Sequence, residues 1–208
     1  MSSSIPLVVV VLVLALVVVL VWLAMRSGGN LIAARNATLA RVASGQGLQV
    51  RTTGDVLLFA ADGTTAAGVP LRINLDRVSG TGHNRGTHWV LRLVARPNGP
   101  RPAILARLRR RASTLTENAP NLHEISTGDA AFDGLFVTAV ENDDEALALL
   151  RSGLLTALAE LRTTPLSGVE VLKVGSEVAL NIDCTFDSGF FDDGRLERAI
   201  AIVVGVAS

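Results

Sequence analysis

The apolar positions of this chain follow two different patterns, one in the first 25 residues and another in the remainder. Residues 5–25 form an unbroken run of 21 apolar residues, IPLVVVVLVLALVVVLVWLAM. A helix of that length rises about 30 Å, the thickness of the hydrocarbon core of a bilayer. Pro6 lies where a first helical turn tolerates proline, and Trp22 lies where an interfacial aromatic residue is expected. The run predicts a transmembrane helix at 5–25, after a short tail at 1–4.

Two other interpretations of this run fit less well. A cleavable secretory signal would have a basic residue before the apolar run and small residues at a cleavage site, but only Met1 and three serines precede the run and Leu23–Arg26 is a poor site. A buried helix of a soluble protein would have a polar face, which this run lacks. We therefore expect contact with a lipid bilayer through residues 5–25.

The charges that flank the run predict its orientation. Arg26, Arg35, Arg41 and Arg51 all follow the run before the first acidic residue, Asp55. By the positive-inside rule, the short N-terminus lies outside and the rest of the chain faces the cytoplasm. The single cysteine, at position 184, excludes an intrachain disulfide and agrees with a reducing compartment. The predicted location is the bacterial inner (cytoplasmic) membrane, with a single span.

After the run, residues 26–47 are predicted to form a juxtamembrane linker and a helix, and residues 48–208 a soluble domain. Gly45 and Gly47 mark the end of that helix. Strict alternation of apolar and polar residues over Val69–Asp76 predicts a strand with one buried face. Asp62-Gly63 is typical of a hairpin turn, and Ile104–Arg111 fits either a strand or a short helix. Further strands are predicted at Leu48–Thr52, Val56–Ala60, His88–Arg96 and Leu122–Ser126.

The second half of the domain mixes helices and strands. Asn142 with Glu145 resembles a capping box, and a stripe of leucines from Leu147 to Leu161 predicts an amphipathic helix before Pro165. Strands are predicted at Val137–Val140, Val169–Val174 and Glu177–Asp183, and a last helix opens at Asp193, although its β-branched tail also fits a strand. Strands and helices occur in runs, which favours an α+β domain with a mostly antiparallel sheet packed against helices.

One motif connects the chain to other proteins. Gly128-Asp129-Ala130-Ala131-Phe132-Asp133-Gly134-Leu135-Phe136 follows a predicted strand and precedes another strand and an acidic helix start. This Gly-Asp-x-x-Phe-Asp-x-x-Phe arrangement resembles an uncharacterised family of membrane-anchored bacterial proteins. The N-terminal apolar run and the β-rich block fit the same layout. The resemblance implies an architecture and no known activity.

The carboxylates of this motif allow two interpretations. Asp129 and Asp133 are four residues apart, so on one helical face they could perform acid–base chemistry or hold a divalent cation. Alternatively, Asp129 caps a short helix while Phe132 and Phe136 fill the core. We favour the structural role.

Other chemistry finds little support in the composition. The chain has 19 basic and 19 acidic residues and no tyrosine, so neither its charge nor its aromatic content points to a nucleic-acid partner. Asp183, Asp187, Asp192 and Asp193 do not follow the spacing of a calcium-binding loop. The three histidines, at 83, 88 and 123, are too dispersed for a zinc site. No catalytic residue, metal site or cofactor is predicted.

A basic cluster offers a different kind of contact. Arg107, Arg109, Arg110 and Arg111 lie within five positions, with Arg101 nearby. Such clusters are usually solvated, but beside a cytoplasmic leaflet they could contact anionic lipid, at about 1 kcal/mol for each basic residue. The leading hypothesis is a membrane-tethered, non-enzymatic module that binds a protein partner or serves as an accessory subunit of a membrane complex. The alternative is a membrane-anchored hydrolase or metal-binding enzyme that uses the Asp129/Asp133 region.

Overall fold

The computed structural model describes residues 16, 19, 31–51, 53–55, 57–79, 87–109, 121–161, 168–185, 191 and 194–208. The chain divides into two compact units, Met1–Ala37 and Thr38–Ser208. In the first unit Leu16, Val19 and residues 31–37 are helical. The rest of 5–25 lies outside the described residues, so the transmembrane helix stays a prediction. Within the described residues, no helix combines the length and hydropathy needed to cross a membrane.

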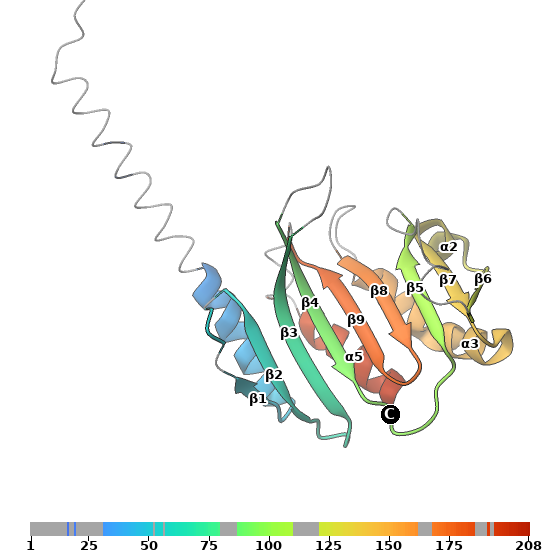
Figure 1. The fold of residues 1–208 in the computed structure, drawn as a ribbon, viewed down its shortest axis with the longest axis horizontal. Helices are drawn as coiled ribbons and strands as arrows, with labels where there is room; N and C mark the ends of the chain where they lie inside the picture. Colours follow the sequence, from blue (N-terminus) through green and yellow to red (C-terminus); the bar gives the residue numbers. More distant parts are fainter. Residues whose placement is uncertain are drawn as a thin grey trace, which may run out of the picture. The chain divides into compact units, whose positions relative to one another are not determined.

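The second unit is built on one sheet of nine strands (Figure 1). Every neighbouring pair is antiparallel, and the strand order is β1-β2-β3-β4-β9-β8-β5-β7-β6. The strands are β1 (Gln49–Arg51), β2 (Phe59–Thr64), β3 (Pro70–Ser79), β4 (Thr87–Ala95), β5 (Ile104–Leu108), β6 (His123–Ile125), β7 (Phe136–Val140), β8 (Gly168–Val174) and β9 (Val178–Asp183). The predicted α+β class and antiparallel sheet are confirmed.

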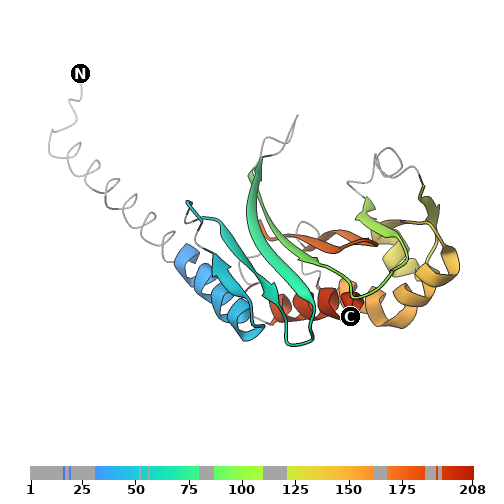
Figure 2. The same ribbon diagram turned by 60° about the horizontal axis from the view of Figure 1, so that its bottom comes forward.

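Helices cover one face of this sheet. They are residues 38–45 of the first helix, α2 (Ala130–Leu135), α3 (Asp143–Leu149), the kinked segment η3 (Leu150–Leu154), α4 (Leu155–Glu160) and α5 (Arg195–Ala207). In Figure 2 α5 runs beneath the middle of the sheet, where it contacts β4 and β9. Its buried side chains include Leu196, Ile200 and Val203. These side chains meet the sheet's apolar face, and the resulting core spans the whole unit.

Alternation along the strands separates the two faces of the sheet. Leu71, Ile73 and Leu75 of β3 are buried towards the helices, and their antiparallel partners Ala95, Leu93 and Leu91 are buried on the same side. The residues between them point the other way and are polar or half-buried: Arg72, Asn74 and Asp76 on β3, Arg92 on β4, and Asn181 on β9. None of the described helices covers this second face, which we call the open face.

The structure corrects two local predictions and decides two segments for which helix and strand were both considered. Asp62-Gly63 is not a turn: it lies within β2, and the chain reverses at residues 65–68, where the Thr65 N–H binds the Val69 carbonyl at 2.9 Å. The leucine stripe is not one regular helix, because Ser152 and Gly153 leave helical geometry (Gly153 φ 101°). The last segment, whose structure the sequence left open, is the helix α5. Ile104–Leu108 is a strand.

Candidate functional site

The Asp129/Asp133 region forms the tight turn that leads into α2. Asp129 has an extended backbone, and its Oδ1 accepts hydrogen bonds from the N–H groups of Ala131 and Phe132, both at 3.0 Å. These N–H groups belong to the first turn of the helix and have no partner within it. Asp129 therefore caps α2, as the structural interpretation predicts.

The Asp133 carboxylate turns back to the start of the same loop. Its Oδ2 accepts a hydrogen bond from the Ser126 hydroxyl at 2.7 Å, and its Oδ1 accepts from the hydroxyl (2.8 Å) and N–H (3.1 Å) of Thr127. Burial acts to raise the pKa of Asp133, but these bonds, with a contribution from the Gly128 backbone, outweigh it and hold the pKa below its ordinary value. Both oxygens therefore hold the loop together, and Asp129 and Asp133 bind different groups.

The basic cluster is only partly described. Arg107 lies in β5 and points to the open face, half-buried. The guanidinium of Arg109 donates to the backbone carbonyl of Asp133 at 2.7 Å and to that of Phe136 at 3.4 Å. Arg109 thus binds the end of α2, and a positive charge is favourable there. Arg110 and Arg111 lie outside the described residues, so lipid contact by this cluster stays a prediction.

A small hollow of about 340 Å³ separates the start of α2 from the break in helical geometry at Gly153, inside η3. Asp129, Gly153 and Thr156 border it. Arg151 closes one side, where it donates twice to the Thr127 carbonyl at 3.0 and 3.3 Å. The side chains of Asp129 and Arg151 at this hollow already bind backbone groups of the protein, which favours a structural role for the hollow.

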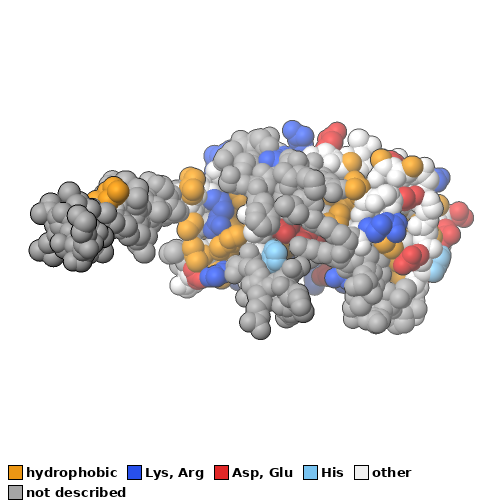
Figure 3. Space-filling model, turned by 90° about the horizontal axis from the view of Figure 1, so that it is seen from above, with side chains coloured by type: hydrophobic (Ala, Val, Ile, Leu, Met, Phe, Trp, Pro, Cys, Tyr) orange, Lys and Arg blue, Asp and Glu red, His pale blue; other side chains and the backbone are white. Residues whose placement is uncertain are grey.

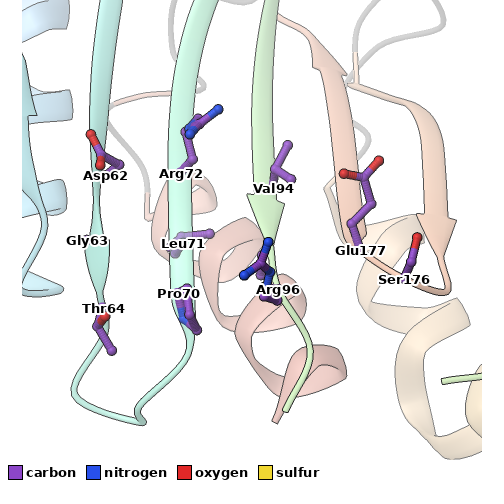
Figure 4. Close-up of a pocket in the computed structure, with 11 residues that line it drawn as sticks. Asp62, Gly63, Thr64, Pro70, Leu71, Arg72, Val94, Arg96, Ser176 and Glu177 are labelled. Carbon is purple, nitrogen blue, oxygen red and sulfur yellow. The ribbon is translucent and has the colours of Figure 1, made fainter. Parts of the chain in front are cut away.

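A larger hollow lies on the open face (Figure 4). This groove has a volume of about 650 Å³ and runs across the ends of β2, β3 and β4 to the β8–β9 turn. Arg72 and Arg96 project from β3 and from the residue after β4, and Thr64 and Ser176 lie at its two ends. These residues are not among the site residues predicted from the sequence. Arg72 could have been found, because the alternation along β3 places its side chain on the polar face of that strand. Ser176 could not, because it joins the groove only through the pairing of β9 with β4, which are far apart in the sequence.

Those of the other predicted acidic residues and histidines that the structure describes are dispersed. His123 Nε2 lies 2.6 Å from Asp143 Oδ1 at the exposed start of α3, and His88 Nδ1 lies 3.8 Å from Asp183 Oδ2 at the far end of β4. His83, Asp187, Asp192 and Asp193 lie outside the described residues. Within the part of the chain that the structure describes, no three of these side chains form a metal-binding group. Seen from above, basic and acidic side chains are interspersed (Figure 3).

These elements define an α+β domain with one open antiparallel sheet and helices on one face. A crystal structure of the mycobacterial trehalose monomycolate transport factor A, TtfA, is similar, with a TM-score of 0.47 and 13% sequence identity over 84% of this chain and 96% of that one. A likeness of this size supports no statement about function. Comparisons with protein-family models and with curated proteins find no match. The family resemblance therefore rests on the Gly128–Phe136 motif and on the layout of the sequence around it.

Proposed function

We propose that this protein is a membrane-tethered, non-enzymatic module that binds a protein partner or serves as an accessory subunit of a membrane complex. The apolar run at 5–25 carries this proposal, because no polar side chain interrupts its 21 residues. Leu16 and Val19, the two residues of the run that the structure describes, are helical and expose 59% and 51% of their surface. Exposed aliphatic side chains on an all-apolar helix are suited to lipid.

The roles of the motif carboxylates favour a module over a hydrolase. A general base or a metal ligand needs a lone pair directed at the substrate or ion. Both Asp133 oxygens instead accept hydrogen bonds from Ser126 and Thr127, and Asp129 caps α2. The enzyme alternative keeps an opening at Asp129, which lines the small hollow and whose second oxygen takes no part in the cap. The Asp129 variants described in the Discussion test it.

Extraction of cell membranes tests the anchor. We expect the full chain to stay in the pellet after washing with alkaline carbonate and to enter solution in non-ionic detergent. Replacing Val10 and Leu14 with arginine should release it, because a charged residue at the centre of a span costs about 2.5–3.5 kcal/mol. A wild-type chain that alkaline carbonate releases would exclude a transmembrane anchor.

Cysteine labelling tests the proposed cytoplasmic orientation. Cys184 is buried and gives a low background, so one variant adds an exposed cysteine, Gly99→Cys, and its matched partner adds Ser3→Cys on the other side of the anchor. In spheroplasts, a membrane-impermeant maleimide should label the Ser3→Cys chain, and should label the Gly99→Cys chain only after detergent. The reverse pattern would refute the orientation.

Affinity purification tests the module itself. The full chain, purified from detergent-solubilised membranes, should bring down one partner in a fixed ratio. The same purification with residues 26–208 alone separates recognition by the domain from recognition by the anchor. Recovery of the full chain alone, under conditions that preserve other membrane complexes, would argue against an accessory subunit.

A further inference from the structure

The groove on the open face has the dimensions of a ligand site. Its volume of about 650 Å³ lies within the range of about 300–1,000 Å³ typical of small-molecule sites. Its floor is the regular ladder of β2, β3 and β4, and the Arg96 N–H binds the Pro70 carbonyl at 3.0 Å, which extends that ladder to the groove's end. Side chains mounted on such a floor have a fixed spacing.

The acidic side chains that line the groove already have basic partners. Asp62 accepts a hydrogen bond from Arg51 across the β1–β2 ladder at 2.7 Å. Glu177 accepts one from Lys173 at 3.0 Å. Their charges are thereby offset from outside the groove.

Arg72 and Arg96 are different. Both are exposed, and among the described residues no ion pair or hydrogen bond engages either guanidinium group. Arg72 is opposite Val94, so Arg96 is its diagonal neighbour on the same face. Diagonal neighbours in an antiparallel sheet have centres about 7–8 Å apart, which two arginine side chains can span towards a shared ligand.

Asp62 is the direct cross-strand partner of Arg72, but its hydrogen bond goes to Arg51, and the hydrogen bond of Glu177 goes to Lys173. The groove and the basic side chains that flank it therefore carry an excess of positive charge.

We propose that the groove binds a phosphate group, held between the guanidinium forks of Arg72 and Arg96. The planar forks match the oxygen spacing of phosphate, and each can donate two parallel hydrogen bonds. The hydroxyls of Thr64 and Ser176, at opposite ends of the groove, are donors for the remainder of a phosphorylated molecule. The inference rests on the groove alone and holds whether or not residues 5–25 span a membrane.

Calorimetric titration of the full chain in non-ionic detergent tests this proposal, with inorganic phosphate as the probe and chloride used to keep the ionic strength constant. We expect saturable binding. Arg72→Gln and Arg96→Gln should each weaken it about tenfold or more, as expected for the loss of a charged hydrogen-bond donor. Arg92→Gln is the matched control, because Arg92 lies on the same face of β4 but is 3.6 Å from Asp76 and outside the groove.

Three results would overturn the proposal: no saturable binding, binding that survives both groove substitutions, or an equal loss in the Arg92→Gln control. Thermal melts without phosphate verify that each variant is folded, since surface substitutions usually change stability by less than about 0.5 kcal/mol. A second titration asks whether the natural phosphate group belongs to a lipid or to a soluble molecule. It repeats the measurement in nanodiscs of phosphatidylcholine with and without phosphatidic acid. Weaker binding of free phosphate in the phosphatidic acid discs identifies a lipid headgroup, and equal binding identifies a soluble phosphorylated ligand.

Discussion

The rings of Phe132 and Phe136 stack with their centroids 4.6 Å apart and their planes inclined by 19°. Phe132 belongs to α2 and Phe136 begins β7, so this contact joins the short helix to the sheet at the point where one becomes the other. Both side chains are 2% exposed. The two phenylalanines of the motif are thus core residues, as predicted from their spacing.

Phe132→Ala should therefore destabilise the domain by about 3–5 kcal/mol, because it removes a buried aromatic ring and leaves a cavity against Phe136. Urea unfolding of the full chain in non-ionic detergent measures the change. Leu135→Ala, at a half-buried position of the same helix, should cost clearly less. Equal stability of wild type and Phe132→Ala would mean that the ring is not in the core.

The cap at Asp129 predicts different outcomes for two substitutions. Asp129→Asn should be nearly silent, since asparagine caps a helix about as well as aspartate, whereas Asp129→Ala should cost roughly 0.5–2 kcal/mol. A metal ligand would behave otherwise, because asparagine lacks the charge. A melting temperature that falls on addition of a chelator, and that loses this sensitivity in Asp129→Asn, would favour the metal-binding alternative.

Asp133 should make part of the stability dependent on pH. Its pKa is lower in the folded chain than its ordinary value, so the folded state favours the ionised form. This contribution is present above the ordinary value, about 3.9, and is lost as the pH falls through the folded pKa. Asp133→Asn should be less stable than wild type at about pH 7, and the difference should shrink at about pH 3. The exposed Glu141→Gln is the control, and a pH-independent gap for Asp133→Asn would contradict the prediction.

Two glycines give a matched pair that tests the break in helical geometry at Ser152 and Gly153, inside η3. A methyl group has open space at both Gly134 and Gly153, but only Gly153 has a positive φ, 101°. Gly153→Ala should destabilise the chain by more than about 1 kcal/mol, because alanine is strained there. Gly134→Ala should be neutral or stabilising by up to about 1 kcal/mol, because alanine favours the helix. Equal melting temperatures for the two variants would argue against this geometry.

Most of the fold could be predicted because local patterns determine it. The alternation over Val69–Asp76 indicated β3 and its buried face, and Asn142 indicated the start of α3, where its side chain accepts from Asp144 and Glu145. The Asp62-Gly63 turn was wrong for a tertiary reason. Asp62 lies opposite Gln49 on β1 and its carboxylate accepts a hydrogen bond from Arg51, and glycine's freedom lets the strand continue through Gly63 at a φ of 158°.

The candidate sites show the same division between local and long-range information. The Asp129 cap involves residues at most three apart, so the sequence sufficed to predict it. The groove brings Arg72 and Arg96 together with Ser176, which is 80 positions further along the chain than Arg96. The periodicity of apolar residues, every two residues in a strand or every 3.6 in a helix, identifies an element but does not show which strands become neighbours. The β4–β9 pairing that creates the groove was therefore beyond prediction from one sequence.

The position of the β8–β9 hairpin has a consequence for the order of events during synthesis. This hairpin lies between β4 and β5, so the strands made first, β1 to β4, connect to β5, β7 and β6 within the sheet only through residues 168–183. Until that hairpin leaves the ribosome, both partial sheets keep an unpaired central edge, which is prone to aggregation. Such long-range pairing also slows folding. A nascent chain of this protein therefore depends on protection of those two edges until its last hairpin arrives.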